Sequence, residues 1–325
     1  MKLKSYQSRR VSKDLVSNTS QLTKSFSAIT KPFLITAKSW IIYDSHTSTI
    51  LLSRKAKEQR EIASLTKIMT AYTVLKIISR LDIGILKMKV KVSSDTFMIN
   101  GTSANLVVGD TLTVWDLLHG LLLPSGNDAA LCLADYFGYI ISEIRLRPPL
   151  NFTDPIGTFV SEMNSNAKEL KLLNTKYANP HGLKDALNKS TAEDIAKLTS
   201  ICMQSPLFSE IVKKTSYTCV AKTVTGISKT YTWYNTNKLL NKGFNGVKTG
   251  NTITAGACLA ASYKDVQYDL VIVALGCKSE SHKWHEVMKL KDFITKKKEE
   301  PLKLPETRRI GRGRSGMLRY NSKNN

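Results

Sequence analysis

Apolar residues recur with a strand-like spacing at both ends of the chain and with a helix-like spacing in the middle. Residues 40–43 and 50–52 are short apolar runs on either side of the polar turn 44–49, which predicts a β-hairpin. Between residues 62 and 78, apolar side chains return every three or four positions, which predicts a helix.

Several further elements are predicted, and their order outlines the fold. Helices are expected at 114–122 (capped by Thr113), 128–137, 159–170, from a capping box at 190–193 to residue 203, and at 282–296. Strands are expected at 89–92, 217–224, 246–248, 255–262 and 268–275. The pattern predicts one sheet built from the two ends of the chain, with a helical lobe inserted between them. A proline-rich stretch at 144–157 is expected to be an exposed surface insertion.

The composition is that of a globular protein: 42% of the 325 residues are hydrophobic and 23% are charged. No apolar run reaches the length that crosses a membrane. The net charge of +22 is concentrated at the ends, with eight basic and one acidic residues in 1–40, and twelve and four in 289–325. We interpret residues 1–31 as a flexible basic leader and 299–325 as a disordered basic tail. No zinc finger or aromatic-interleaved basic face accompanies them, so no specific nucleic-acid binding is predicted.

Cysteine and histidine patterns predict neither a metal nor a cofactor. The five cysteines form no Cys-x-x-Cys pair and are expected to be buried in a reduced protein: Cys132, Cys202, Cys219, Cys258 and Cys277. His282 and His285 are three apart, but no Asp, Glu or Cys cluster completes a site around them.

The compartment is left open by the sequence. The first 40 residues lack the apolar core of about 7–15 residues that a secretory signal needs. As written, the chain has no visible export route and would stay cytoplasmic; the alternative is an exported protein whose start is misassigned.

Three short motifs carry candidate chemistry: Ser64-x-x-Lys67, Ser125-x-Asn127 and Lys248-Thr249-Gly250. Each is weak alone, and Ser-x-x-Lys recurs at Ser165. Residues three apart on a helix share a face, so Lys67 can lie beside the Ser64 hydroxyl. Lysine can activate that serine only if its pKa falls, through burial or a second cation that Lys248 could supply.

The other two motifs could complete a site around this pair. On a loop between two helices, the Ser125 hydroxyl could relay a proton and the Asn127 amide could hold a substrate backbone. At the end of a strand, Lys248 and Thr249 could bind a carboxylate. Gly250 would let a ligand lie close to the strand edge.

With their flanks, these motifs resemble the serine D-Ala-D-Ala carboxypeptidases, the low-molecular-weight penicillin-binding proteins of peptidase family S11. The matching segments are residues 63–71, 120–130, 179–183, 235–240 and 246–250. The resemblance covers about residues 38–295, and we assign residues 32–298 to one catalytic domain. It implies an α+β, β-lactamase/transpeptidase-like fold, with an antiparallel sheet flanked by helices and an all-helical lobe.

The resemblance also implies roles for residues. Ser64 would be acylated by the penultimate D-Ala carbonyl, with release of the terminal D-Ala and later hydrolysis of the ester by water. Lys67 would be the base, Ser125 the proton relay and Asn127 a substrate-positioning group.

The remaining implied residues bind the substrate. Lys248, Thr249 and Gly250 would hold the terminal carboxylate, and the N–H groups of Ser64 and Asn251 would form the oxyanion hole. The implied partners are the peptidoglycan stem peptides of the cell wall, or analogues of these peptides. β-Lactams would be covalent inhibitors.

Some features depart from the family pattern. Asn251 stands where a histidine or an aromatic residue is common, and the spacing from Ser125 to Lys248 is long. Neither a second β-domain nor a carboxy-terminal amphipathic anchor is predicted. Two alternatives stay open: a hydrolytic β-lactamase, for which Glu162 lacks the expected Glu-x-x-Leu-Asn pattern, and a non-catalytic ligand-binding protein on the same scaffold.

Overall fold

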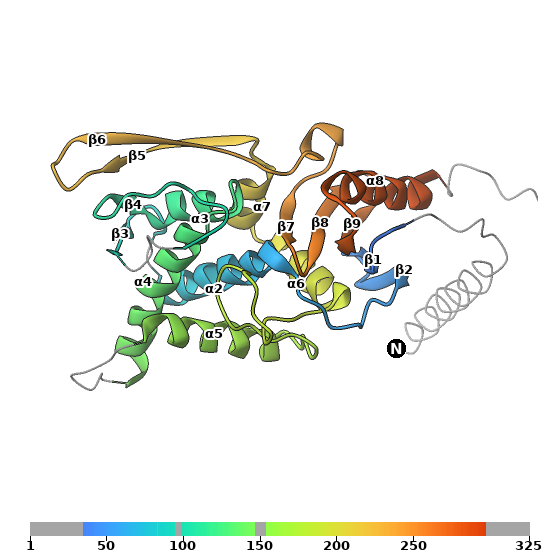
Figure 1. Ribbon diagram of the computed structural model, residues 1–325, viewed down its shortest axis with the longest axis horizontal. Helices are drawn as coiled ribbons and strands as arrows, with labels where there is room; N and C mark the ends of the chain where they lie inside the picture. The colour runs from blue at the N-terminus through green and yellow to red at the C-terminus, as the bar shows by residue number, and fades with distance from the viewer. Residues whose placement is uncertain (1–34, 83, 95–98, 147–153, 297–325) are drawn as a thin grey trace, which may run out of the picture.

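The computed structural model describes residues 35–82, 84–94, 99–146 and 154–296. The predicted leader (1–31) and tail (299–325) lie outside these residues. The described chain is an α+β structure in which helices pack against two antiparallel sheets (Figure 1).

The first sheet unites the two ends of the chain, as the sequence predicted. Its five strands run antiparallel in the order β2-β1-β9-β8-β7. Their bounds are β1 Ser39–Asp44, β2 Thr49–Arg54, β7 Val247–Thr252, β8 Gly256–Lys264 and β9 Asp269–Cys277. Trp40 lies opposite Ala274 in the pairing of β1 with β9. Strand β7 is therefore an edge strand, and its free edge is available to a site.

Helices cover both faces of this sheet (Figure 1). Helix α8 (Glu280–Lys296) packs on β8 and β9 through Val287 and Leu290, which join an apolar cluster separate from the main core. Helix α6 (Ala192–Gln204) covers the opposite face, against β1 and β9. The Glu286 carboxylate of α8 accepts hydrogen bonds from the N–H groups of Thr36 and Ala37, and so ties the chain before β1 to this helix.

The inserted lobe was predicted to be all-helical, and this is wrong. It holds α2 (Thr66–Leu81), α3 (Val114–Leu122), α4 (Asn127–Leu146), α5 (Pro155–Glu169) and α7 (Pro206–Lys213). It also carries a second sheet, β3-β4-β5-β6, with bounds β3 Lys89–Lys91, β4 Thr111–Thr113, β5 Ser216–Lys222 and β6 Ser228–Tyr234. Strand β4 has only three residues, and β6 alternates Thr230 and Thr232 with Tyr231 and Trp233, so neither produces a long apolar run.

Other boundaries also differ from the prediction. Helix α4 runs on to Leu146, and α5 begins at Pro155 behind an Asp154 N-cap, so both helices enter the expected insertion at 144–157. Residues 147–153 of that stretch lie outside the described residues. The N-cap of α6 is Thr191, whose hydroxyl accepts from the N–H of Asp194, one position later than the predicted capping box. Thr113 caps α3 as predicted.

Candidate active site

Ser64 lies on a short 3₁₀ turn, η1 (Ala63–Leu65), that leads directly into α2. This turn packs against β7 at Gly250. A Cβ at Gly250 would lie 3.0 Å from the Ser64 nitrogen and 3.1 Å from the carbonyl oxygen of Ile62. The sequence suggested that Gly250 makes room for a ligand, but here its lack of a side chain lets the serine turn approach the strand edge.

Lys67 lies one turn along from Ser64, and its ammonium group contacts the serine hydroxyl. The distance from Lys67 Nζ to Ser64 Oγ is 3.1 Å. The same ammonium donates to Asn127 Oδ1 and to the carbonyl oxygen of His181, both at 2.7 Å. The Lys67 side chain is fully buried, so three polar contacts hold it at a fixed point beside Ser64.

The surroundings of Lys67 lower its pKa well below the usual value of a lysine. Burial is the largest cause, because it disfavours the charged form, and the positive charge of Lys248 acts in the same direction. Asp128 opposes both effects. A lysine with a lowered pKa is a usable base at neutral pH, so this pair can activate the Ser64 hydroxyl.

Ser125 and Asn127 lie at the junction of α3 and α4. Ser125 has a left-handed backbone, with φ of 67°, and is almost fully buried, while Asn127 is the first residue of α4. Among the described residues, Asn127 and not Ser125 is hydrogen-bonded to Lys67. Both polar atoms of the Asn127 side chain are hydrogen-bonded, since its Nδ2 donates to the carbonyl oxygen of Asn100 at 2.7 Å.

Lys248 belongs to β7 and is buried, and its Nζ donates to the carbonyl oxygen of Thr249 at 2.9 Å. Burial, reinforced by the charge of Lys283, lowers the pKa of Lys248 to about 7. Thr249 lines the cleft beside Ser64, and its hydroxyl is 2.9 Å from that of Thr236. A carboxylate in the cleft would thus meet two hydroxyls, and a nearby amine able to take up a proton.

These residues surround one cleft of about 550 Å³. Ser64, Ser125, Asn127, Thr249, Gly250 and Asn251 all line it. Sequence analysis missed further lining residues, which are Gly101, Thr102, Leu183, Thr236, Lys238, Thr252, Glu280, Lys283 and Trp284. Thr236 and Lys238 lie in a segment that matched the family pattern; the residues of α8 and of the stretch 101–102 gave no comparable signal.

The turn at residues 179–182 contacts the Ser64 turn and Lys67 from the other side. The Pro180 carbonyl accepts from the Thr70 hydroxyl at 2.6 Å, next to the His181 carbonyl that accepts from Lys67. Gly182 has φ of +89°, and a Cβ there would lie 2.0 Å from the carbonyl oxygen of Ala63. This backbone contact with the active site was not foreseen from the sequence.

The His181 ring has a fixed place in this turn. Its Nδ1 accepts from the N–H of Leu183 at 3.1 Å. Burial and the charge of Lys67 lower the pKa of His181 to about 3, so the ring is neutral.

Comparison with known proteins agrees with this geometry. The family model described as "D-alanyl-D-alanine carboxypeptidase" matches residues 25–139 and 155–279. The chain belongs to this family, peptidase family S11. Membership makes the chain a serine hydrolase of the D-Ala-D-Ala carboxypeptidase type, and the antiparallel sheet with flanking helices is the expected fold.

Two curated members of the family illustrate the likeness. A Streptomyces (strain K15) D-alanyl-D-alanine carboxypeptidase is 39% identical over 236 residues, which are 71% of this chain and 77% of that one. D-alanyl-D-alanine carboxypeptidase DacF of Bacillus subtilis is 33% identical over 261 residues, 79% of this chain. The chain spans 61% of the length of that Bacillus relative.

A solved structure shows the same fold. The crystal structure of the Streptomyces K15 DD-transpeptidase superposes with a TM-score of 0.74 at 33% identity. The match covers 82% of this chain and 98% of that one.

The described residues contain neither a membrane-spanning helix nor a cluster of potential metal ligands. No helix in this part of the chain has the length and apolar character to span a bilayer. Nor do His, Cys, Asp and Glu side chains gather there in a group of three or more that could hold a metal. His282 and His285 instead form hydrogen bonds with Ser279 and with the Ser281 carbonyl.

Proposed function

We propose that this chain removes the terminal D-Ala from peptides ending in D-Ala-D-Ala, through an acyl-enzyme on Ser64. The observation that carries the proposal is the 3.1 Å contact between the Ser64 hydroxyl and the buried Lys67 amine. Family membership supplies the reaction class, and this contact supplies the nucleophile and its base. Peptidoglycan stem peptides, or analogues of them, are the proposed substrates.

In the proposed acylation, neutral Lys67 takes the proton of the Ser64 hydroxyl as Oγ attacks the penultimate carbonyl carbon. The N–H groups of Ser64 and Asn251 stabilise the oxyanion. When the C–N bond breaks, the departing D-Ala amine receives the proton from Lys67, with Ser125 relaying it across the cleft. In the proposed deacylation, water attacks the ester and gives a proton to Lys67. The C–O bond to Ser64 then breaks, and Lys67 passes that proton to the Ser64 oxygen.

The carboxylate of the terminal D-Ala is proposed to bind at Thr249 and Thr236. Their hydroxyls face the cleft and are 2.9 Å apart. Buried Lys248 supplies positive charge when protonated, whereas Lys283, in the cleft wall, is ion-paired with Glu280 at 2.6 Å. β-Lactams carry a comparable carboxylate and would acylate the same serine.

The geometry disfavours the β-lactamase alternative in the form that used Glu162 as a deacylating base. Glu162 is buried on α5, with its carboxylate 3.4 Å from the Arg80 guanidinium, and it is not part of the cleft wall. The non-catalytic alternative is disfavoured because Ser64 and Lys67 are in hydrogen-bonding contact.

Labelling with a fluorescent penicillin tests the proposal. The wild type and Ser165→Ala should form a covalent adduct, whereas Ser64→Ala should not. Ser165 is the matched control because it belongs to the second Ser-x-x-Lys sequence, lies on α5 and is exposed. Release of D-Ala from a D-Ala-D-Ala peptide by the wild type should then depend on Ser64. A folded wild type that forms no adduct and releases no D-Ala would refute the proposed function.

A further inference from the structure

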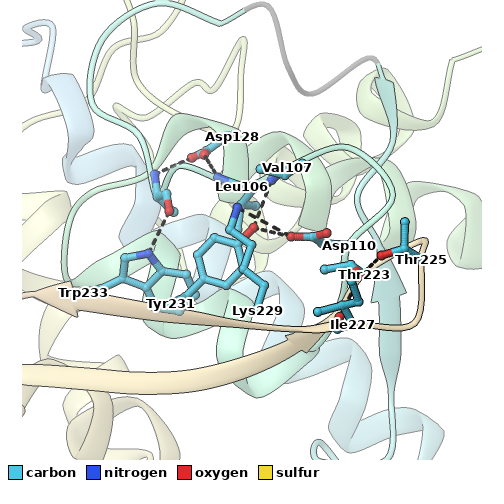
Figure 2. A network of polar contacts seen from close by, with 11 residues as sticks. Leu106, Val107, Asp110, Asp128, Thr223, Thr225, Ile227, Lys229, Tyr231 and Trp233 are labelled. Atoms are coloured by element: carbon cyan, nitrogen blue, oxygen red, sulfur yellow. Dashed lines mark hydrogen bonds and ion pairs between the residues drawn. The ribbon is translucent and has the colours of Figure 1, made fainter.

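Two aromatic side chains of β6 contact a segment that borders the cleft. Tyr231 and Trp233 point inward from the sheet, are almost fully buried, and reach residues 100–110, as Figure 2 shows. None of the three motifs lies on β6. Strand β6 is nevertheless connected to the active site, because it contacts residues 100–110, which in turn contact Ser125 and Asn127. We call residues 100–110 the bridging segment.

Trp233 packs on the bridging segment where this segment contacts the turn that contains Ser125. The indole Nε1 donates to the carbonyl oxygen of Ala104 at 2.8 Å (Figure 2). Ala104 in turn lies against Gly126 and Gly120, where an added Cβ would approach the Ala104 Cβ to 2.8 Å and 3.2 Å. The indole ring would be 3.4 Å from the Cβ at Gly120. Little free space is left between β6 and the Ser125 turn.

Tyr231 holds the other end of the bridging segment. Its hydroxyl accepts from the N–H of Val107 at 3.1 Å and donates to Asp110 Oδ2 at 2.5 Å (Figure 2). Asp110 is buried, and Lys229 of the same strand places its ammonium 3.8 Å from this carboxylate. One hydroxyl therefore fixes both the main chain and a carboxylate of the segment.

Asp128, in the first turn of α4, ties the middle of the bridging segment to the active-site helix. Its carboxylate accepts from the Ser103 hydroxyl at 2.6 Å and from the N–H groups of Ala104 and Leu106 at 2.8 and 3.0 Å. Figure 2 shows Asp128 and Trp233 holding neighbouring parts of the segment.

The beginning of the bridging segment reaches the catalytic side chains. The carbonyl oxygens of Asn100 and Thr102 accept from the side-chain and main-chain N–H groups of Asn127, at 2.7 and 2.8 Å. The Thr102 hydroxyl donates to the carbonyl oxygen of Ser125 at 2.6 Å. Asn127 therefore connects this segment to Lys67, because its Oδ1 accepts from the Lys67 amine.

We propose that Tyr231 and Trp233 are positioning residues of the active site, which hold the bridging segment so that Ser125 and Asn127 stay aligned with Lys67. This inference rests on the proposed function. Both aromatic residues act through the segment and touch neither Ser64 nor the cleft. A misalignment of about 1 Å at a reacting centre can cost about 100-fold in rate, so small shifts of the segment should be measurable.

The test compares two variants, each lacking one polar group that holds the bridging segment, with a matched control variant. Tyr231→Phe removes the hydroxyl on Val107 and Asp110, and Trp233→Phe removes the donor to Ala104. The control is Tyr217→Phe, on the paired strand β5, where the lost hydroxyl donates to Asp116 at 2.7 Å and has no contact with the bridging segment. Unfolding free energies are measured beside penicillin acylation, and kcat and KM for D-Ala release.

A positioning role predicts that Tyr231→Phe and Trp233→Phe lower the acylation rate constant and kcat by about 3- to 100-fold. Tyr217→Phe should stay within about twofold while losing comparable stability. The acidic limb of the acylation–pH profile should also move to lower pH in the two variants, because a displaced Asn127 no longer stabilises the Lys67 ammonium.

Equal acylation rates and pH profiles in Tyr231→Phe, Trp233→Phe and Tyr217→Phe would overturn the inference, since the contacts would then be structural only. If one variant does not fold, the other decides the question. A wild type that fails to react with penicillin would instead overturn the proposed function, so the two failures are distinguishable.

Discussion

Replacing Gly182 by alanine should displace Ser64, the proposed nucleophile, without altering any side chain that is proposed to act in catalysis. Gly182 has φ of +89°, and an added Cβ would lie 2.0 Å from the Ala63 carbonyl oxygen and 2.9 Å from the Thr66 hydroxyl. Those two residues flank Ser64. The turn at residues 179–182 or the serine turn must therefore move to admit a methyl group.

The expected loss of unfolding free energy has two parts, which a control variant can separate. A side chain in the left-handed region costs about 1–2 kcal/mol, and overpacking a tight site adds about 1–3 kcal/mol. Gly226 has φ of +80° but no atom within 4 Å of an added Cβ, so Gly226→Ala should show the first cost alone. Gly182→Ala should therefore lose about 2–5 kcal/mol of unfolding free energy.

The functional effect should exceed the loss of stability. A displacement of Ser64 by about 1 Å should slow penicillin acylation by about 100-fold, whereas Gly226→Ala should acylate at the wild-type rate. The measurements are denaturant unfolding and stopped-flow acylation of both variants under conditions where each is folded. The reasoning is refuted if Gly182→Ala matches Gly226→Ala in both stability and acylation rate.

Two further predictions concern buried groups. The pKa of Lys248 is about 7 when folded and near 10.4 when unfolded, so between these pH values the unfolded state holds the extra proton and stability should rise with pH. The rise in unfolding free energy attributable to Lys248 is at most about 1.4 kcal/mol per pH unit. Lys248→Met should lack this rise when denaturant unfolding is measured from pH 6 to 10. A pH dependence of stability parallel to that of the wild type would contradict the pKa assignment. All five cysteines are buried free thiols, so a thiol reagent should label less than about one per native molecule and five after unfolding; rapid labelling of the native protein would show that one is accessible.

The Ser64–Lys67 pair could be predicted because its geometry is local. Residues three apart at the start of a helix share a face wherever that helix is placed, and burial by any neighbour lowers the lysine pKa. The sequence also predicted that Lys248 could lower the pKa of Lys67, because the strand that carries Lys248 was expected at the same site.

The partner of Lys67 could not be predicted in the same way. The sequence predicted Ser125 in the proton path and Asn127 on the substrate, and both line the cleft; it did not predict the hydrogen bond from Lys67 to Asn127. Which of two side chains on one tight turn faces the lysine depends on the backbone, including the left-handed conformation of Ser125. Such a conformation is rare for serine and has no simple sequence signal.

The second sheet was missed for a different reason. Strand β6 alternates Thr230 and Thr232 on its exposed face with Tyr231 and Trp233 on its buried face, which satisfies period 2 without an aliphatic run. Its paired strand β5 was predicted because the apolar content there is higher. The core of the inserted lobe therefore includes the aromatic side chains Tyr231 and Trp233, which a search for aliphatic runs does not reveal.

The position of β1 between β2 and β9 also sets an order of folding. Trp40 pairs with Ala274, and the hydrogen bond from Thr36 to Glu286 spans 250 residues. Contacts of such long sequence separation form slowly, because a large loop must close before they contribute. Ser64 also needs β7, from far later in the chain, to complete its surroundings. During synthesis Ser64 and Lys67 therefore emerge long before β7, whose Lys248 helps to lower the pKa of Lys67, and reactivity towards penicillin would report that the chain has finished folding.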